Sequence, residues 1–212
     1  ISIMLNEVQV KELREHLDRA QNPLFFFDND NDGLCSFLLL RRFIDLGKGV
    51  SIKSFPDLNI SYYRKVKELH PDYVFILDKP LVSREFIKKV KEDNIPIVWI
   101  DHHQTEGCDD PDVHYYNPYF FDKTHEPISY LSFQLSTRKE DIWLALIGCI
   151  SDCYLPEFYK NFEKKFPELG KKHPQSAFDL LYNSEIGKIA RILDFSLKDI
   201  TSHVVAMIKF MG

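Results

Sequence analysis

The sequence has few cysteines, few glycines and no long apolar run. Its 212 residues include 4 cysteines, none in Cys-x-x-Cys spacing, and 8 glycines. This pattern argues against a disulfide framework, and we expect reduced cysteines that pack in the interior. No segment is long and apolar enough to cross a membrane, and no signal peptide precedes the first predicted helix. These absences favour a cytoplasmic location. We also find no internal repeat and no low-complexity tract.

An excess of basic charge is lacking as well. The chain carries 27 Lys and Arg against 32 Asp and Glu, which gives a formal net charge of −5. A nucleic-acid enzyme is expected to be basic, but bound cations would offset several of the acidic residues discussed below. The net charge therefore neither supports nor excludes DNA as a ligand. It does argue against tight, sequence-independent binding of long duplex.

Strands and helices are predicted to alternate along most of the chain. With 44% hydrophobic residues, including 17 Phe and 10 Tyr, the chain can bury one sizeable core. Strands are expected at 24–27, 50–55, 73–77 and 95–100, and helices at 5–20, 33–46, 61–69, 83–93, 126–136 and 139–153. Residues 107–123 are predicted to form an aromatic loop. This order predicts an α/β fold with a parallel, doubly wound sheet of about five strands and helices on both faces.

Three aspartates at alternate positions follow the first predicted strand. Asp28, Asp30 and Asp32 come directly after the apolar run 24–27 and precede a glycine. Such clustered carboxylates repel one another unless a cation neutralises them. An EF-hand loop is excluded, because its twelfth position requires a bidentate Glu and is Leu39 here. A phosphatase with an Asp nucleophile matches only in part. For this segment alone, an acidic surface turn and a metal site both remain open.

Further candidate ligands follow the next apolar segments. These are Asp78 after the run 73–77, Asp101-His102-His103 after the run 95–100, and Asp152 after the apolar helix 142–150. Because the carboxyl ends of parallel strands meet at one edge of a sheet, we expect these groups to gather there. They offer more ligands than one hard ion needs, so two divalent metal ions that share a carboxylate fit the set better. Oxygen ligands with one or two imidazoles favour Mn²⁺, with Mg²⁺ second.

In order and spacing, these residues resemble the four motifs of the DHH phosphoesterase superfamily. The motifs are Asp28-x-Asp30-x-Asp32-Gly33, Asp78, Asp101-His102-His103 and the segment from Gly148 to Asp152. The first motif resembles the RecJ-type nuclease branch, because pyrophosphatase-like and oligoribonuclease-like branches carry a histidine just upstream, where this chain has Phe26. The resemblance covers roughly residues 22–155.

The resemblance implies a role for each motif residue. Two metal ions would be held by Asp28, Asp30, Asp32, Asp78, His102 and Asp152, with Asp78 between them. The implied catalytic residues are His103, which would contact the scissile phosphate, and Asp101, which would orient neighbouring groups. Candidate substrate-binding residues are Arg41, Lys79 and Asn117.

The resemblance also implies a domain organisation and an activity. Residues 1–155 would form a DHH-type catalytic domain, and residues 156–212 a helical extension packed on it or leading out of it. A Gly-rich clamp segment, typical of the usual C-terminal substrate-binding domain, is not found. The implied activity is that of a two-metal phosphodiesterase acting on single-stranded DNA or short oligonucleotides, from the 5′ end.

Two alternatives stay open. The chain could hydrolyse a small phosphorylated molecule, such as a cyclic dinucleotide, a dinucleotide or pyrophosphate. It could instead be a non-catalytic module associated with replication, although retention of the full ligand set argues against this, because without metals the clustered charges have no purpose. The expected partners are single-stranded nucleic acid, a replication or repair protein, or a separate substrate-binding domain, and no membrane.

Overall fold

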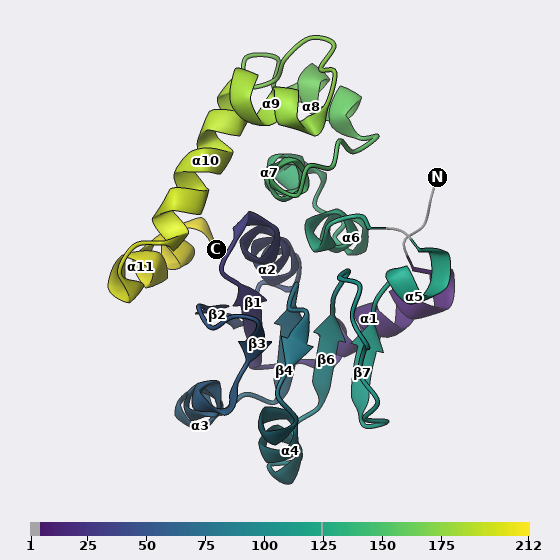
Figure 1. The fold of residues 1–212 in the computed structure, drawn as a ribbon, viewed down its shortest axis with the longest axis vertical. Coiled ribbons are helices and arrows are strands. Elements are labelled where there is room, and N and C mark those ends of the chain that lie inside the picture. Colours follow the sequence, from purple (N-terminus) through teal and green to yellow (C-terminus); the bar gives the residue numbers. More distant parts are fainter. Residues whose placement is uncertain (1–4, 124) are drawn as a thin grey trace. The chain divides into compact units, whose positions relative to one another are not determined.

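Five parallel strands form the main sheet of the structure, a computed structural model that describes residues 5–123 and 125–212 (Figure 1). The sheet order is β2-β1-β4-β6-β7. Its strands are β1 (Pro23–Asp28), β2 (Lys48–Ile52), β4 (Tyr73–Leu77), β6 (Ile97–Ile100) and β7 (Val113–Tyr116). The strand order reverses at β1, which pairs with both β2 and β4. In parallel α/β sheets, ligands bind beyond the carboxyl ends of the strands at such a reversal. The predicted α/β fold with a parallel sheet is confirmed.

The described chain divides into two compact units, and each is considered by itself below. The first unit comprises Ile1–Asp28 and Ile44–His125, and the second comprises Asn29–Phe43 and Glu126–Gly212. The first boundary therefore falls inside the Asp-x-Asp-x-Asp motif. The domain boundary predicted at residue 155 stays a prediction.

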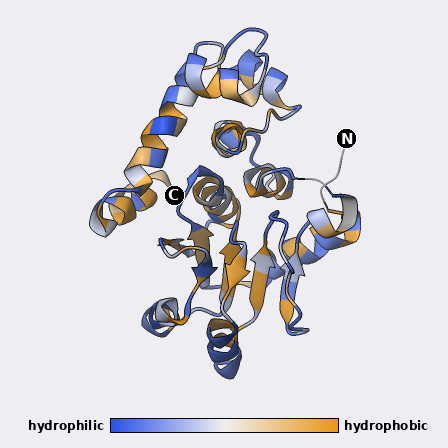
Figure 2. Cartoon of the chain, in the orientation of Figure 1, coloured by the Kyte–Doolittle hydropathy of each residue, from blue (hydrophilic) through white to orange (hydrophobic). Residues whose placement is uncertain are grey.

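In the first unit, helices cover both faces of the sheet. Alternate strand residues point to opposite faces. On one face, residues of β1, β4 and β6 pack against helices α3 (Tyr63–Leu69) and α4 (Arg84–Glu92), in a core that includes Leu24, Phe26, Val74, Ile76, Ile97, Trp99, Val66, Phe86 and Val90. On the other face, α1 (Glu7–Arg19) packs through His16, whose ring centroid lies 5.9 Å from that of Tyr73 and 4.2 Å from that of His114. Figure 2 shows β4 and β6 as largely hydrophobic, as expected for inner strands buried on both faces.

Helix α4 begins where its sequence predicts. The Oγ atom of Ser83 accepts a hydrogen bond from the backbone N–H of Phe86 at 3.2 Å, which is a side-chain cap of the first turn. Glu85 precedes Lys89 by four residues, a spacing that predicts an ion pair, but Lys89 lies 2.6 Å from Glu92 instead. Both pairings join residues on the same side of the helix, and the exposed lysine takes the nearer carboxylate.

The segment 107–123 differs from the predicted loop. It contains strand β7 and the short helix α5 (Tyr119–Asp122). β7 extends the main sheet by pairing in parallel with β6, in the register Ile97↔Val113 to Ile100↔Tyr116. Val113 and Tyr116 are buried, whereas His114 is exposed. Only the long-range pairing with β6 makes this aromatic segment a strand.

The second unit is helical. Its helices are α2 (Asn31–Ile44), α6 (Ile128–Leu135), α7 (Ile142–Ser151), α8 (Tyr159–Lys165), α9 (Ala177–Asn183), α10 (Glu185–Leu197) and α11 (Thr201–Met211). Asn31 joins three of them, since its Nδ2 atom donates to Oγ of Ser151 at 2.9 Å and to the carbonyl of Ala190 at 2.8 Å. The predicted helical character of residues 156–212 is confirmed. Within the described residues, no helix combines the length and apolar character that a membrane span needs.

Candidate metal centre

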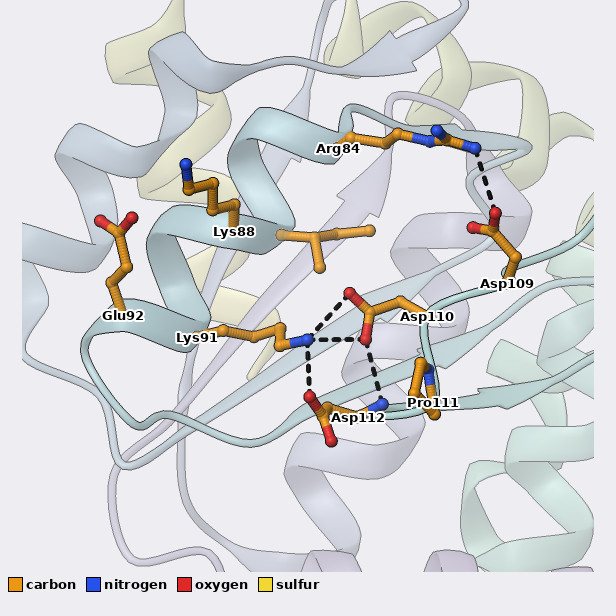
Figure 3. A pocket seen from close by; sticks show the side chains of 9 residues that line it. Arg84, Lys88, Lys91, Glu92, Asp109, Asp110, Pro111 and Asp112 are labelled. Carbon is orange, nitrogen blue, oxygen red and sulfur yellow. Dashed lines mark hydrogen bonds and ion pairs between the residues drawn. The ribbon is translucent and has the colours of Figure 1, made fainter.

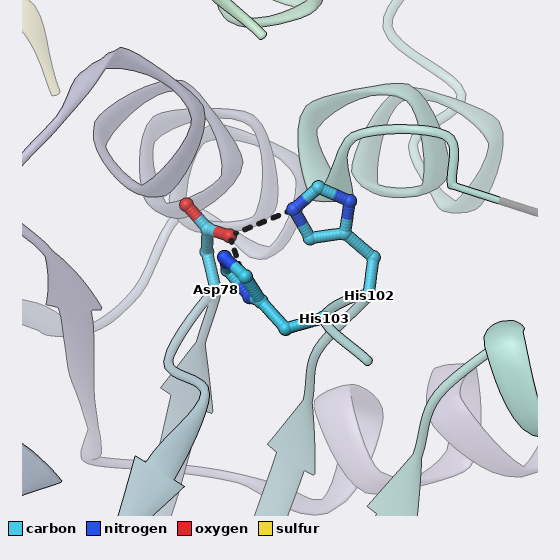
Figure 4. Close-up of side chains that lie close together, drawn as sticks. All are labelled: Asp78, His102 and His103. Carbon is cyan, nitrogen blue, oxygen red and sulfur yellow. Dashed lines mark ion pairs between the residues drawn. The ribbon is translucent and has the colours of Figure 1, made fainter. Parts of the chain in front are cut away.

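Asp78, His102 and His103 meet at the carboxyl edge of the sheet in the first unit (Figure 4). Each offers a ligand atom, and these atoms lie within 4.8 Å of one another. The Nε2 atom of His102 is 3.2 Å from Oδ1 of Asp78, and Nδ1 of His103 is 3.9 Å from the same oxygen. A buried carboxylate beside two imidazoles is a donor set that fits a divalent transition metal. We expected the motif residues to lie together at the carboxyl edge of the sheet, and the structure brings Asp78, His102 and His103 together there.

Strand register explains why the motif residues are neighbours. Phe27 of β1 pairs with Leu77 of β4, and Leu77 pairs with Ile100 of β6. Asp28 is the last residue of β1, and Asp78 and Asp101 directly follow β4 and β6, so each comes directly after one of these paired positions at the same edge. The backbone N–H of Asp78 continues the ladder by donating to the carbonyl of Ile100 at 2.9 Å.

Asp78 has an unusual backbone conformation. Its φ angle is 56°, in the left-handed region. Asp and Asn enter this region more easily than other residues with a side chain, yet it still costs free energy, on the order of 1 kcal/mol. The side chain is also only 2% exposed. A conformation of this kind, kept at a buried carboxylate, is typical of functional sites.

Asp101 and Asn117 hold His103 in place. Oδ1 of Asp101 lies 2.7 Å from Nδ1 of His103, and its Oδ2 accepts a hydrogen bond from the backbone N–H of His103 at 3.2 Å. Nδ2 of Asn117 donates to the carbonyl of His103 at 2.9 Å. This carboxylate favours the imidazole tautomer with its proton on Nδ1, which leaves Nε2 to face a ligand. The His103 side chain is 41% exposed, so it is accessible.

The geometry gives Asp101 and Asn117 positioning roles. Asp101 is fully buried and Asn117 is 1% exposed, and the oxygen of the Asn117 amide also accepts a hydrogen bond from the backbone of Tyr119 at 3.0 Å. An orienting role for Asp101 agrees with the sequence-based interpretation. For Asn117, the internal bonds support the shape of the His103 loop rather than a direct substrate contact. The catalytic roles of His103 and Asp101 stay predictions.

Lys79 is paired inside the first unit. Its Nζ atom lies 2.8 Å from Oδ1 of Asp28 and donates to the carbonyl of Ser54 at 2.9 Å. Lys79 is fully buried, and its charge offsets that of the Asp28 carboxylate. This burial favours a structural role for Lys79 over the substrate contact predicted from the sequence. Periodicity and motif spacing do not signal the pairing, because the two residues lie 51 positions apart.

The remaining predicted ligands belong to the second unit. Asp32, in the first turn of α2, accepts hydrogen bonds from the backbone N–H groups of Ile128 at 2.7 Å and Ser129 at 2.9 Å, which begin α6. Asp32 and Asp152 offer carboxylate oxygens within 4.8 Å of each other. Oδ1 of Asp30 accepts from the backbone N–H of Gly33 at 2.9 Å.

Sequence reasoning missed the capping role of Asp32. A helix N-terminus has N–H groups without intrahelical partners and favours negative charge. Helix α6 follows Pro127, which provides no side-chain cap. Because Pro127 provides no cap, the first turn of α6 needs a hydrogen-bond acceptor from elsewhere in the chain. This was the signal in the sequence that could have indicated the role of Asp32.

The second unit also contains Arg41, which was predicted to bind substrate, and the buried cysteines Cys35 and Cys149. Arg41 is in the last turn of α2, beside Gly212. Burial and the Asp32 carboxylate raise the pKa of the Cys35 and Cys149 thiols well above their usual range. These thiols stay protonated at neutral pH, which agrees with the packing role expected for them. The same expectation is wrong for Cys153, which is exposed because it lies beyond the end of α7.

A separate surface cleft of about 770 Å³ lies between α4 and the segment before β7 (Figure 3). Lys91 pairs there with Asp110 and Asp112 at 2.7 Å each, and Arg84 pairs with Asp109 at 3.1 Å. Its charged groups therefore largely neutralise one another. No predicted site residue is among those that line this cleft in the described chain.

Comparisons with known proteins agree with the motif pattern. A family model described as the DHH family, N-terminal domain, matches residues 24–143. No curated protein matches the chain. Among solved structures, exonuclease RecJ bound to manganese has a TM-score of 0.67 and 14% identity, covering 100% of this chain and 66% of that one.

Two further structures share the fold. RecJ from Thermus thermophilus in complex with Mn²⁺ has a TM-score of 0.61 and 15% identity, covering 99% of this chain and 38% of that one. CDC45 from Entamoeba histolytica has a TM-score of 0.55 and 13% identity, covering 80% of this chain and 41% of that one. The chain thus spans less than two thirds of the length of these proteins. At such identities the likeness shows the fold alone.

Proposed function

The chain belongs to the DHH family, and from this membership we propose that it is a metal-dependent phosphodiesterase. The proposed substrates are single-stranded DNA or short oligonucleotides, cleaved from the 5′ end. The observation that carries the proposal is the group of Asp78, His102 and His103, whose ligand atoms lie within 4.8 Å of one another. Of this group, Asp78 and His102 are proposed metal ligands, because a buried carboxylate needs a counter-charge, and His103 is proposed to contact the scissile phosphate beside them.

Two divalent ions are proposed as cofactors, with Mn²⁺ preferred and Mg²⁺ as the second choice. The proposed ligands are Asp28, Asp30, Asp32, Asp78, His102 and Asp152, with Asp78 shared, and this full set rests on the sequence motifs. The fold likeness to two RecJ structures that contain manganese supports the choice of metal. Bound ions of this type would activate water and stabilise charge that develops on the phosphate.

The chain's own residues would position the substrate phosphate and hold the charges in place. Asp101 fixes the proton of His103 on Nδ1, so that Nε2 can interact with a phosphate oxygen or its proton. Asn117 keeps the His103 loop in position through its bond to the His103 carbonyl at 2.9 Å. Lys79 keeps Asp28 in place at 2.8 Å and limits repulsion among the carboxylates.

The proposal is tested by assaying the purified chain with Mn²⁺ on several substrates in parallel. These are 5′-labelled single strands, circular single strands, blunt duplexes, dinucleotides, cyclic dinucleotides and pyrophosphate. We expect release of short products from linear single strands, with little attack on circles or blunt duplexes. Internal cuts on circular DNA would instead show an endonuclease. Full activity in EDTA would contradict metal dependence.

The same assay separates the alternative functions. Turnover of dinucleotides or pyrophosphate without cleavage of longer strands would identify a small-molecule phosphohydrolase. A non-catalytic module associated with replication would turn over none of these substrates with any metal. The fold likeness to CDC45 is compatible with a non-catalytic module. The group of Asp78, His102 and His103 at the carboxyl edge of the sheet favours an enzyme.

A further inference from the structure

Phe55 presents an exposed aromatic ring on the loop that follows β2. The residue is 86% exposed. β2 runs parallel to β1, and Ile52 at its end pairs with Asp28. The loop that carries Phe55 therefore begins at the same edge of the sheet as Asp28, on the side of the candidate metal centre.

The backbone on both sides of Phe55 is held by hydrogen bonds. On the N-terminal side, the carbonyl of Ser54 accepts a bond from Lys79 at 2.9 Å, and the N–H of Lys53 donates to the Tyr62 hydroxyl at 2.8 Å. On the C-terminal side, β3 (Asp57–Leu58) pairs in parallel with β5 (Leu81–Val82). The ring is thus exposed on a fixed support, which lowers the entropy lost when a flat ligand packs on it.

One side chain links this ring to the metal centre. The Nζ atom of Lys79 lies 5.9 Å from the centroid of the Phe55 ring and 2.8 Å from Oδ1 of Asp28. Lys79 is fully buried and contacts both groups, so the Phe55 ring lies near the Asp28 carboxylate, which is a proposed metal ligand. An exposed ring near the proposed metal ligands can receive a base attached to a phosphate that binds there.

Two aromatic residues of the segment 107–123 are used in internal contacts. Tyr116 is 5% exposed, and the ring of Tyr115 packs against Trp99 with a centroid distance of 4.6 Å. Burial raises the pKa of Tyr115 to about 12, and its hydroxyl accepts a hydrogen bond from Asn117. Tyr116 is buried and Tyr115 is partly buried against Trp99, whereas the Phe55 ring is largely exposed.

We propose that Phe55 stacks on a nucleobase of the substrate whose phosphate lies at the Asp78–His102–His103 centre. The inference rests on the proposed function and narrows its substrate class to nucleotides and oligonucleotides, as opposed to phosphates without a base. Stacking on an aromatic ring contributes about 1–3 kcal/mol per base and tolerates any base. It also selects for single strands, because a base in a duplex is already stacked and paired.

Binding and turnover of the Phe55→Ala, Phe55→Leu and Phe55→Trp variants test this role. Affinity is measured for a short single strand with Ca²⁺ in place of Mn²⁺, and for the same strand with abasic sites, while 2-aminopurine fluorescence reports stacking. We expect Phe55→Ala to weaken binding of the base-containing strand about 5- to 150-fold and to remove the fluorescence quenching. Phe55→Trp should bind as well as the unmodified protein, and Phe55→Leu should resemble Phe55→Ala.

Substrate and variant controls make the result specific. The abasic strand should bind equally to all Phe55 variants, and KM for base-containing strands should rise while kcat changes little. Phe210→Ala, which removes a 93% exposed ring from α11, should leave both affinities unchanged. Unaltered affinity in Phe55→Ala, or an equal loss with the abasic strand, would overturn the stacking role.

The two proposals can fail separately. If the unmodified protein cleaves single strands and Phe55→Ala cleaves them with the same KM, the stacking inference is wrong and the proposed function stands. If the unmodified protein neither binds nor cleaves any base-containing substrate but hydrolyses pyrophosphate, both are wrong.

Discussion

The Nζ atom of Lys79 lies 2.8 Å from Oδ1 of Asp28, and this lysine is fully buried whereas the aspartate side chain is 21% exposed. The pair joins the last residue of β1 to the loop after β4. It places one positive charge beside the Asp28 carboxylate and offsets its negative charge. Removing the lysine would leave Asp28 without its cation and the carbonyl of Ser54 without its donor.

We expect Lys79→Met to lower the free energy of unfolding by about 2–4 kcal/mol, because breaking one half of a buried ion pair leaves the other charge uncompensated. Lys11→Met is the control, since the Lys11 side chain is 79% exposed and its loss should change stability by less than about 0.5 kcal/mol. Urea unfolding followed by circular dichroism measures both. Equal stability of Lys79→Met and the unmodified protein would show that the pair contributes nothing.

If Asp78 is the proposed shared ligand, Asp78→Asn should reduce turnover about 100-fold or more, because a neutral amide does not replace the charge of a carboxylate ligand. Asn is used because it tolerates the left-handed φ of 56° at this position. Without metal, the variant should be as stable as the unmodified protein or slightly more stable, since one repelling carboxylate is removed. Activity and Mn²⁺ titration measure the two effects, and normal turnover would rule out the shared-ligand role.

Asp32→Ala should behave differently from Asp152→Ala. The first change removes the acceptor of two buried N–H groups at the start of α6 and should destabilise the fold by about 2–3 kcal/mol even without metal. Asp152, which follows α7 and is exposed, should be replaceable with little loss of stability. Both changes should weaken metal binding. Thermal unfolding in EDTA separates the variants, and equal stability would contradict the capping role of Asp32.

Stability should fall in mild acid because of His16. Burial, His114 and Arg19 lower the pKa of His16 from 6.5 to about 4, although Glu15 opposes this shift. Between these two pH values the unfolded chain binds a proton at His16 that the folded chain does not bind. The contribution of neutral His16 to the free energy of unfolding is therefore complete above pH 6.5 and is lost as the pH falls towards 4. We expect a loss of about 2 kcal/mol, allowing for partial solvent screening.

The variant His16→Gln tests this assignment. It should flatten the decline in unfolding free energy over that pH window, as measured by urea unfolding at a series of pH values. His203→Gln is the control, because the His203 side chain is 65% exposed and should leave the decline intact. An unchanged slope in His16→Gln would assign the pH dependence to other groups.

Activity should depend on the metal supplied. We expect strong turnover with Mn²⁺, weaker turnover with Mg²⁺ and none in EDTA, because the proposed ligands combine carboxylates with imidazole. Ca²⁺ should support little turnover, since its larger and more flexible coordination shell positions reactants poorly. Steady-state rates after removal of metal and addition of each ion measure this order. Equal rates with Ca²⁺ and Mn²⁺ would contradict the proposed preference.

The strand-forming runs and the motif residues were readable from the sequence because their signals are local. The runs before Asp28, Asp78 and Asp101 are continuously apolar, as inner parallel strands must be, and each ends in a polar residue. The rule that parallel strands share one carboxyl edge then brings Asp78 and the two histidines together, as the structure shows. Strand β7 was not predicted from the sequence, because residues 113–116 have a mixed aromatic and polar pattern and form a strand by pairing with β6.

By itself, the sequence determined the parallel α/β fold, most of its strands and helices, and the motif residues Asp78, His102 and His103, because periodicity and motif spacing are properties of neighbouring residues. Tertiary structure alone decided the partners of those residues. Lys79 became a buried counter-charge to Asp28, Asp32 became the cap of a distant helix, and Phe55 remained exposed. The physical reason is that burial and hydrogen-bond partners depend on segments far apart in the chain, which only folding brings into contact.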